Sequence, residues 1–488
     1  MSRTPILGFR RRNALILFSS LVLLVWSHGF AADGPQATHY SLRVNIVPAE
    51  ERMAGTAQIT ISNTSATRLR EIHFLLYRLL AVEAAEDEHG APLPYHQAVV
   101  SMSDEKNWQV NSVSVRLRQP LAAGSIAKIT LKYSGAIFGY REVMGYVRDH
   151  IGEDYALLRQ DALAYPILAG ASFRSLMATI DTRFDYDLEI TVPKGMVVAC
   201  GGELRATSAE NSTQTFRFVS GLPTWRIDIA AANFKVLKNS AGNLVVYVLA
   251  DDESRASNLL AEMERVTAFY TRRFGPSEKA KAYTVIETPE GYGSQAGDGY
   301  ITLQANALKD PEGIYQIYHE IGHAWNAQVK PELQRVRWFD EAFASYFAAL
   351  AVREFNGQKA FDDEMSRYRE HFRHDAKRDA RNATTPIADY GKLEIGENSY
   401  TKGAWSLFVL EEIVGEEQFN QIIRTLLSEF SARPADFKDF QNVVARVSKR
   451  DLSRFFSEWI YGVESSQLLM GDASIQEIVQ RYREKAGG

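Results

Sequence analysis

The chain has 488 residues, 45% of them hydrophobic, and a formal net charge of −5 at pH 7. A chain of this length has room for about three domains with sizeable apolar cores. Its basic residues are scattered and outnumbered by acidic ones, which argues against a nucleic-acid partner. The single cysteine, Cys200, excludes an intrachain disulfide and a metal site built from several thiolates.

Residues 1–31 have the pattern of an export signal peptide. Arginines at positions 10–12 precede an apolar run, Ala14–Trp26, and small residues suited to cleavage follow near Ala31. If the signal is not cleaved, the mostly apolar stretch Ala14–Ala32 is just long enough to anchor the protein in a membrane. A secreted animal protein of this size would commonly carry disulfides. We therefore expect a bacterial envelope protein, periplasmic or extracellular, with a soluble body.

The segment from residue 38 to residue 240 is predicted to form a β-sandwich-like domain. Short stretches of alternating polar and apolar residues, separated by turn residues, are typical of strands. Many such strands without helical patterns between them indicate packed sheets. The clearest strands are His39–Val47, Ala57–Ile61, Val110–Leu117, Ala127–Tyr133, Asp185–Val192 and Thr215–Val219.

The next segment, residues 241–375, mixes strand and helix patterns. Asn243–Ala250 and Tyr283–Thr288 are predicted strands, and Glu253–Phe274 between them is a predicted amphipathic helix. A glycine-rich stretch, residues 291–299, allows the backbone to approach a neighbouring group closely. It leads into Tyr300–Leu303, which we interpret as an edge strand able to hydrogen-bond an extended peptide.

The segment His319-Glu320-Ile321-Gly322-His323 lies on a predicted buried helix. Residues four apart share one face of a helix, so His319 and His323 can bind one divalent ion, and Glu320 can reach a water on it. The alternative is a pair of ordinary core histidines. A metal held by two imidazoles needs a third protein ligand, commonly a carboxylate, which Asp340 or Glu341 at the start of a second helix can supply.

After Leu350 the sequence is charged and helical. Residues 352–381 predict long helices with one solvated face, to which we assign His371 and His374 rather than to a second metal site. A polar loop then ends at Tyr400. Further helices are predicted at Ala404–Val414, Phe419–Phe430, Phe437–Val447 and Leu452–Tyr461. We divide this part into a helical domain, residues 376–465, and a short tail, residues 466–488.

The segments H-E-x-x-H-A-W-N and W-F-D-E-A-F-A-S-Y resemble the gluzincin metallopeptidases, in particular the membrane alanyl aminopeptidase family that includes leukotriene hydrolase. The resemblance implies that His319, His323 and Glu341 bind one zinc ion and that Glu320 is the general base. It also implies a catalytic role for Tyr400, which opens a Y-x-K-G-A segment. This chain has one residue fewer than the family between the second histidine and the glutamate, so Asp340 stays the alternative ligand. Ser345, one turn after Glu341, is a candidate to support a histidine.

The resemblance further implies a multidomain α+β protein. Its parts would be the N-terminal β-sandwich-like domain, a thermolysin-like zinc catalytic domain at residues 241–375, and a C-terminal α-helical region whose domain at residues 376–465 closes the site. The substrate would be a peptide or protein, and the activity that of an aminopeptidase-like zinc metallopeptidase.

The glycine-rich stretch departs from the family pattern. There the family carries a glutamate that binds the free amino terminus of the substrate, whereas this chain has Ala296. We place the substrate-binding residues beside it, at Ser294, Gln295 and Gly297. The candidates to replace the missing acid are Glu287, Glu290 and Asp298. Two alternatives therefore stay open: a zinc endopeptidase without recognition of a free amino terminus, and a non-catalytic peptide-binding protein on the same fold.

Overall fold

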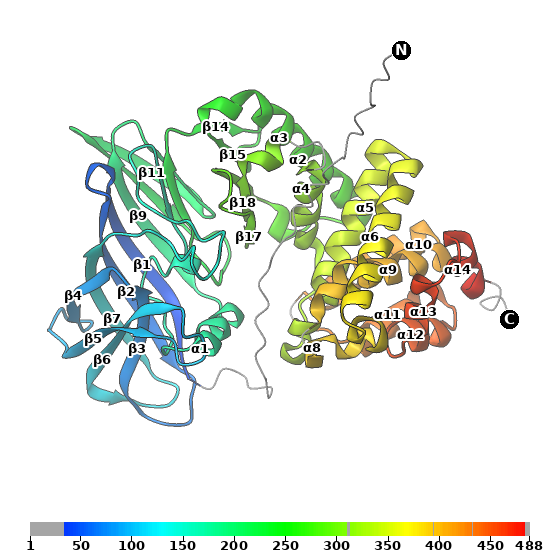
Figure 1. The fold of residues 1–488 in the computed structure, drawn as a ribbon, viewed down its shortest axis with the longest axis horizontal. Helices are drawn as coiled ribbons and strands as arrows, with labels where there is room; N and C mark the ends of the chain where they lie inside the picture. Colours follow the sequence, from blue (N-terminus) through cyan, green and yellow to red (C-terminus); the bar gives the residue numbers. More distant parts are fainter. Residues whose placement is uncertain (1–33, 310–312, 394, 432, 484–488) are drawn as a thin grey trace, which may run out of the picture.

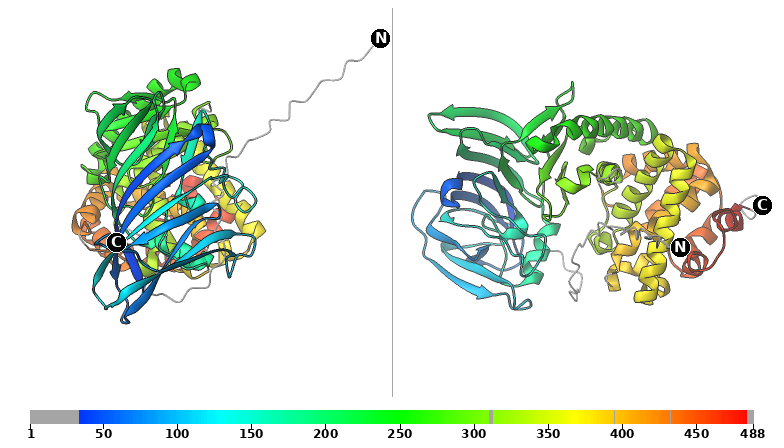
Figure 2. Two further views of the ribbon diagram at one scale, coloured as in Figure 1. Left: turned by 90° about the vertical axis from the view of Figure 1, so that its left-hand side faces the viewer. Right: turned by 45° about the horizontal axis from the view of Figure 1, so that its top comes forward.

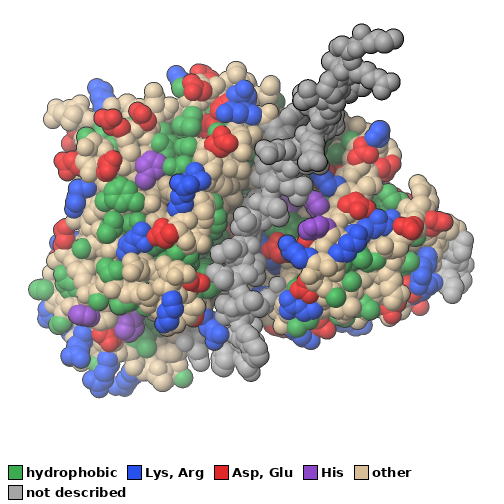
Figure 3. All heavy atoms as spheres, in the orientation of Figure 1, with side chains coloured by type: hydrophobic (Ala, Val, Ile, Leu, Met, Phe, Trp, Pro, Cys, Tyr) green, Lys and Arg blue, Asp and Glu red, His purple; other side chains and the backbone are tan. Residues whose placement is uncertain are grey.

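The structure, a computed structural model, describes residues 34–309, 313–393, 395–431 and 433–483. The predicted signal peptide and the last residues of the predicted tail lie outside this range. Figure 1 shows a β-rich part and a helical part on opposite sides, with a smaller mixed sheet between them. No helix among the described residues is long and apolar enough to cross a membrane. In Figure 3, acidic and basic side chains are interspersed over both sides of the molecule.

Three sheets form the N-terminal part. The largest has seven strands in the order β11-β12-β9-β1-β2-β7-β4, and β1 at its centre pairs antiparallel with β2 and parallel with β9. The other two have the orders β10-β13-β8 and β3-β6-β5. The strands are β1 (Pro35–Val47), β2 (Arg52–Asn63), β3 (Leu69–Tyr77), β4 (Leu80–Glu86), β5 (Tyr95–Ser101), β6 (Gln109–Leu121), β7 (Ile126–Gly135), β8 (Tyr155–Leu158), β9 (Asp185–Pro193), β10 (Val197–Cys200), β11 (Glu203–Glu210), β12 (Thr213–Val219) and β13 (Ile229–Ala232).

Alternating burial explains which strands the sequence predicted. Along β1 the side chains of Tyr40, Leu42, Val44 and Ile46 are buried, and the residues between them are more exposed. β8 and β13 are buried on both faces, so their residues do not alternate between polar and apolar. The sequence pattern therefore did not predict them. The domain also contains one helix, α1 (Phe173–Ala178), that was not predicted.

A five-stranded sheet links the two sides of the molecule, in the order β14-β15-β16-β18-β17. Its strands are β14 (Lys235–Lys238), β15 (Leu244–Val248), β16 (Tyr283–Thr288), β17 (Gln295–Gly297) and β18 (Tyr300–Gln304). β15, β16 and β18 are parallel, and α2 (Glu253–Phe274) is the crossover that connects the first two. The predicted strand at Tyr300–Leu303 is present as β18, but its predicted place at the sheet edge was wrong: β18 lies between β16 and β17, and β17 forms the edge.

Helices make up the rest of the described chain, and Figure 2 shows them on the side away from the large sheet. They are α3 (Ala305–Lys309), α4 (Gly313–Gly322), α5 (Phe343–Asn356), α6 (Gln358–Arg378), α7 (Arg381–Thr384), α8 (Tyr390–Leu393), α9 (Lys402–Val414), α10 (Glu416–Glu429), α11 (Phe437–Ser448), α12 (Ser453–Trp459), α13 (Glu464–Met470) and α14 (Ile475–Arg483).

One apolar core runs through the mixed sheet and all the larger helices, from Leu244 to Tyr482. The predicted boundary between the catalytic domain and the helical domain, at residues 375 and 376, falls inside α6. The segment interpreted as a tail contains most of α13 and all of α14, whose residues Leu469 and Ile478 are buried in the same core. The N-terminal sheets have a separate core, in which the thiol of Cys200 is buried.

Candidate metal centre

The first helix of the centre is α4, which is packed on one face and carries the histidines on another. Ile317, Tyr318 and Ile321 are buried in the core, so the side of α4 that bears His319 and His323 turns towards α5. The helix ends at Gly322, and His323 begins a single 3-10 turn. A Cβ on Gly322 would lie 3.4 Å from the backbone of Ala344, so the glycine lets α4 and α5 approach closely.

The second element is a π-helical turn, Trp338–Ala342, which precedes α5. The sequence predicted an ordinary helix start at this point. The turn follows Arg337, whose φ of 58° lies in the left-handed region. Trp338 is fixed by its hydrogen bond to Ser406 Oγ, at 2.9 Å. The turn therefore holds Glu341 at the edge of the core, where its side chain is buried.

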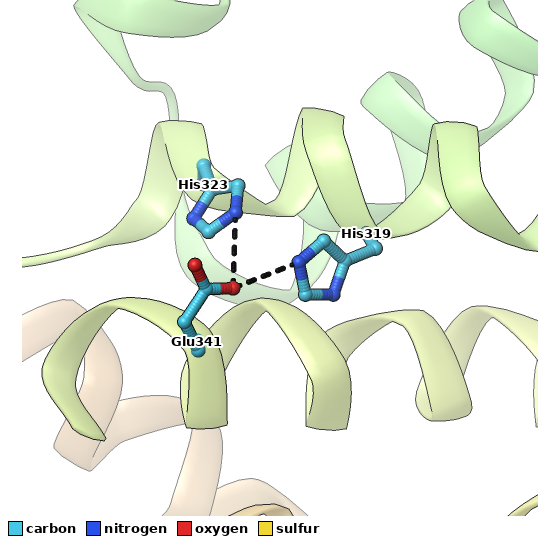
Figure 4. Close-up of side chains that lie close together, drawn as sticks. All are labelled: His319, His323 and Glu341. Carbon is cyan, nitrogen blue, oxygen red and sulfur yellow. Dashed lines mark hydrogen bonds and ion pairs between the residues drawn. The ribbon is translucent and has the colours of Figure 1, made fainter. Parts of the chain in front are cut away.

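His319, His323 and Glu341 converge on one point, as Figure 4 shows. Glu341 Oε2 lies 3.0 Å from His319 Nε2 and 3.5 Å from His323 Nε2. Ligands about 2.0 Å from a tetrahedral zinc ion lie about 3.3 Å from one another. All three ligating atoms lie within 4.8 Å of one another, and no other group of three among the described residues could hold a metal ion. Two imidazoles and one carboxylate fit a zinc ion that keeps a fourth position open.

Asp340 supports a ligand instead of being one. Its Oδ1 lies 2.7 Å from His323 Nδ1, the ring nitrogen that points away from Glu341. Asn326 Nδ2 donates to the same carboxylate oxygen at 2.7 Å. This contact fixes the orientation of the His323 ring and makes its Nε2 the ligating atom. Ser345 Oγ lies 3.4 Å from His319 Nδ1, in the supporting position expected from the sequence.

The electrostatics of the site favour metal binding by these groups. Burial would raise the pKa of Glu341, but the guanidinium of Arg337 lowers it, so the carboxylate is ionised. Burial would lower the pKa of His323, but Asp340 and Glu341 outweigh it and raise the pKa to about 10 in the metal-free protein. A metal ion must therefore displace a proton from this imidazole.

Glu320 lies beside the ligands without joining them. Its side chain is buried, and burial raises the pKa of its carboxyl group, although the neighbouring imidazoles of His319 and His323 counteract the rise. A raised pKa brings a carboxylate closer to the value that suits proton exchange near neutral pH.

Tyr400 lies beside the centre, at the end of a 3-10 turn, Gly396–Tyr400. Its ring stacks on that of His319, with ring centres 5.6 Å apart and planes 15° apart. Burial and the carboxylate of Glu341 raise the pKa of Tyr400, against the opposing effect of Arg337, so the phenol keeps its proton. The Arg337 guanidinium lies 5.3 Å from the centre of the Tyr400 ring and also pairs with Glu341.

The predicted substrate-binding residues are engaged within the protein. Ser294 Oγ accepts a hydrogen bond from the backbone N–H of Gln304 at 3.1 Å. A Cβ on Gly297 would lie 2.1 Å from the ring of Tyr300, so no larger residue fits there. Gln295 Oε1 accepts hydrogen bonds from Arg159 at 2.9 Å and from Arg226 at 3.1 Å.

These arginines belong to a buried charge network between the N-terminal part and the hairpin β17–β18. Arg159 forms two hydrogen bonds with Asp149, at 3.0 and 2.7 Å. Arg226 contacts Asp161 at 2.6 Å and Asp228 at 2.8 Å. Three carboxylates thus face two guanidinium groups. The side chain of Asp161 is 19% exposed and the other four at most 3% exposed, so the excess negative charge lies where Asp161 meets solvent.

The three candidates to replace the missing glutamate are placed differently. The Glu287 side chain is fully buried, and its Oε2 accepts a hydrogen bond from the backbone N–H of Leu249 at 2.6 Å. Asp298 lies 3.8 Å from Arg183, and Glu290 is exposed. Asp161 is a further candidate, because its Oδ1 lies 3.3 Å from Nε2 of Gln295, the residue that precedes Ala296 in the sequence.

Comparison with known proteins agrees with the fold and with the set of metal ligands described above. Residues 303–459 match the peptidase family M1 domain. This match confirms the gluzincin resemblance found in the sequence. The matched range contains the residues that converge on the metal centre, from α4 to α9.

Relatives of the chain include aminopeptidases. A leucyl aminopeptidase from Saccharolobus solfataricus is 24% identical over 306 residues, which cover 56% of this chain and 38% of that protein. A glutamyl aminopeptidase from Rattus norvegicus is 21% identical over 462 residues, which cover 89% of this chain and 48% of that protein. The chain spans less than half the length of these two curated relatives.

Solved structures show the same architecture. The crystal structure of an M1 zinc metallopeptidase from Deinococcus radiodurans matches this chain with a TM-score of 0.59 and 16% sequence identity. The match covers 91% of this chain and 94% of that chain. The likeness confirms the predicted multidomain α+β fold. Another structure from this organism contains a Tyr-Ser-Ala substrate, at 18% identity and a TM-score of 0.59.

Sequence reasoning missed three residues that contact the centre or its surroundings. Asn326 ends the H-A-W-N segment and Arg337 directly precedes W-F-D-E, so both adjoin motifs that carried the resemblance. Their closeness to the ligands was an available signal. No signal in the sequence marked Asp161, because it comes near β17 only through the packing of two domains.

Proposed function

We propose that this protein is a zinc-dependent metallopeptidase that hydrolyses peptide bonds in the manner of an aminopeptidase. The observation that carries the proposal is the convergence of His319, His323 and Glu341, with a buried Glu320 beside them. The M1 domain match and the aminopeptidase relatives support the same activity. A protein that only binds peptides would have no need of a general base or of an open metal position.

Residues of the chain account for the proton transfers. When bound, the zinc ion would act as a Lewis acid that polarises the scissile carbonyl and makes a water molecule more acidic. Glu320 accepts a proton from the attacking water and passes it to the leaving amine. Tyr400 keeps its proton and so can donate a hydrogen bond to the carbonyl oxygen as negative charge develops there.

Asp161 favours an aminopeptidase over an endopeptidase. An aminopeptidase needs an anion near the first residue of the substrate, and Ala296 cannot supply it. The pKa of Asp161 would be raised by burial but is lowered by Arg226 and Arg159, so its carboxylate is ionised. It is the one partly exposed acid in a network with more carboxylates than guanidinium groups. An endopeptidase stays the second candidate, because Ala296 takes the place of an acid.

One peptide in two forms tests the proposal. Incubate the zinc-loaded protein with a peptide that carries either a free or an acetylated amino terminus, and follow the products by mass spectrometry. We expect residues to be lost one at a time from the free form only, and a chelator to abolish the reaction until zinc is restored. Internal cuts in both forms would establish the endopeptidase, and two intact peptides would leave a binding protein.

Substitution of Asp161 tests its role in the same assay. We expect Asp161→Asn to raise KM for the free peptide by about tenfold or more, because a charge-assisted contact of roughly 1.5–3 kcal/mol is lost. The control is Asp154→Asn, since Asp154 is an exposed aspartate of the same domain. Equal KM values for the two variants would remove Asp161 from the substrate site.

We further propose that the protein is exported to the bacterial envelope. The support is the pattern of residues 1–31, a basic start followed by an apolar run and small residues. Protein recovered from the periplasm or medium, with a mass that lacks about the first 31 residues, is the expected result. Full-length protein retained in the cytoplasm would contradict it.

A further inference from the structure

Lys402 is a fully buried lysine that the proposed chemistry does not use. It is the first residue of α9 and comes two residues after Tyr400. Its Nζ donates a hydrogen bond to Ser466 Oγ on α13 at 2.9 Å and lies 6.0 Å from the centre of the Tyr390 ring. Among the described residues, no carboxylate forms an ion pair with it. A buried ammonium group without an anion is costly, particularly at a helix amino terminus, where the helix dipole is positive.

The environment of this amine resists its charge. Burial lowers the pKa of Lys402 to about 7, and the Glu464 carboxylate partly opposes that change. The titratable groups that face the amine are Tyr390 on α8 and Glu464 on α13. Burial raises the pKa of Tyr390 well above its ordinary value, so that phenol stays neutral near pH 7. The amine therefore changes its protonation state near neutral pH while the Tyr390 phenol keeps its proton.

The helix that carries Ser466, α13, is fixed at its C-terminal end. Arg369 and Arg373 of α6 both donate hydrogen bonds to the backbone oxygen of Leu469, at 2.9 and 2.8 Å. Arg369 also donates to the oxygen of Ala473 at 2.6 Å, beyond the end of α13. Guanidinium groups that cap the last carbonyls of α13 fix this helix against α6. The Ser466 hydroxyl is thus a stationary partner for Lys402.

The stretch that carries Tyr400 is tied down on both sides of the phenol. On the preceding side, Ser399 Oγ donates to the backbone oxygen of Val336 at 2.7 Å, close to the π-helical turn. On the following side, a Cβ on Gly403 would lie 2.7 Å from the Cβ of Ala342, so α9 packs directly against that turn. The bond from Lys402 to Ser466 is the side-chain tie that connects this stretch to the C-terminal helices.

We propose that Lys402 is a positioning residue for Tyr400, and that its bond to Ser466 makes the C-terminal segment, residues 464–483, part of the catalytic unit. This inference rests on the role of Tyr400 in the proposed function. Loss of the tie releases the first turn of α9 and lets the phenol leave the position from which it reaches the carbonyl oxygen. Because the phenol acts on the developing charge, its displacement lowers kcat more than it changes KM.

The test compares Lys402→Met, which keeps the length of the side chain, with Lys392→Met, which removes an exposed lysine on α8. We expect Lys402→Met to lower kcat about tenfold or more with little change in KM, as expected when a catalytic group is misplaced. The kcat–pH profile of the wild type should contain an ionisation near pH 7 that Lys402→Met lacks. Ser466→Ala, which removes only the hydroxyl, should reduce kcat in the same direction.

A second measurement needs no turnover. Hydrogen exchange of the metal-free protein should be faster in residues 396–405 of Lys402→Met and Ser466→Ala than in Lys392→Met. Identical exchange, kcat and pH profiles in all three variants would overturn the inference. An inactive wild type would reject the proposed function alone, since the exchange measurement still decides whether the tie exists. If Lys402→Met does not fold, the Ser466→Ala variant decides the outcome.

Discussion

Glu320→Gln is expected to lower kcat/KM for peptide hydrolysis by about two to four orders of magnitude, the usual contribution of a positioned general base. Glutamine has the same shape but cannot accept the proton of the attacking water. Zinc content should be unchanged, because the three ligating atoms belong to His319, His323 and Glu341. The measurement is the initial rate on the free peptide, together with metal analysis of the purified variant.

The matched control is Glu332→Gln, because Glu332 is an exposed glutamate in a 3-10 helix, Pro331–Val336, between the two ligand-bearing elements. It should retain the wild-type rate. Full activity of Glu320→Gln with a normal zinc content would show that another group is the base. Loss of zinc from Glu320→Gln would instead show that Glu320 takes part in binding the metal.

Tyr400→Phe is expected to lower kcat by about two to three orders of magnitude, the loss seen when one donor to a developing oxyanion is removed. The ring that stacks on His319 is retained, so folding and zinc content should not change. KM should change little, since the hydroxyl acts on the charge that forms during the reaction. Steady-state kinetics on the free peptide would measure both parameters.

Tyr461→Phe serves as the control for this variant, because Tyr461 is an exposed tyrosine of the same helical part. A kcat for Tyr400→Phe within a few-fold of this control would contradict the assignment. A fall in kcat that is accompanied by loss of zinc would mean that the phenol acts through Glu341 instead.

Part of the fold could be read from local patterns. Glu253–Phe274 and Tyr283–Thr288 have the predicted bounds, because an amphipathic period and flanking turn residues mark both ends. The two histidines were placed by helical spacing alone. Such features depend on a few neighbouring residues, so one sequence is sufficient to find them.

Other features depend on contacts between distant segments. The π-helical turn at Trp338–Ala342 is held by packing against α9 and α11, and no local pattern distinguishes it from an ordinary helix start. Residues 466–488 were predicted to be a short tail, yet α13 and α14 bury apolar side chains in the common core. The resemblance favoured Glu341 over Asp340 as the ligand, but only the structure shows which ring nitrogen of His323 each one meets.

The single core from Leu244 to Tyr482 determines how the molecule should unfold. The metal ligands and Tyr400 lie on or next to α4, α5 and α9, and these helices share that core and thus one cooperative folding unit. A metal ion that binds only the native state adds its binding free energy to this unit as a whole. The N-terminal sheets have their own core, but Tyr155 and Ala199 of this part also pack against the mixed sheet, at Tyr247, Ile286 and Tyr300. Zinc should therefore raise the unfolding temperature of the zinc-binding part directly, and that of the β-rich part only through these shared contacts.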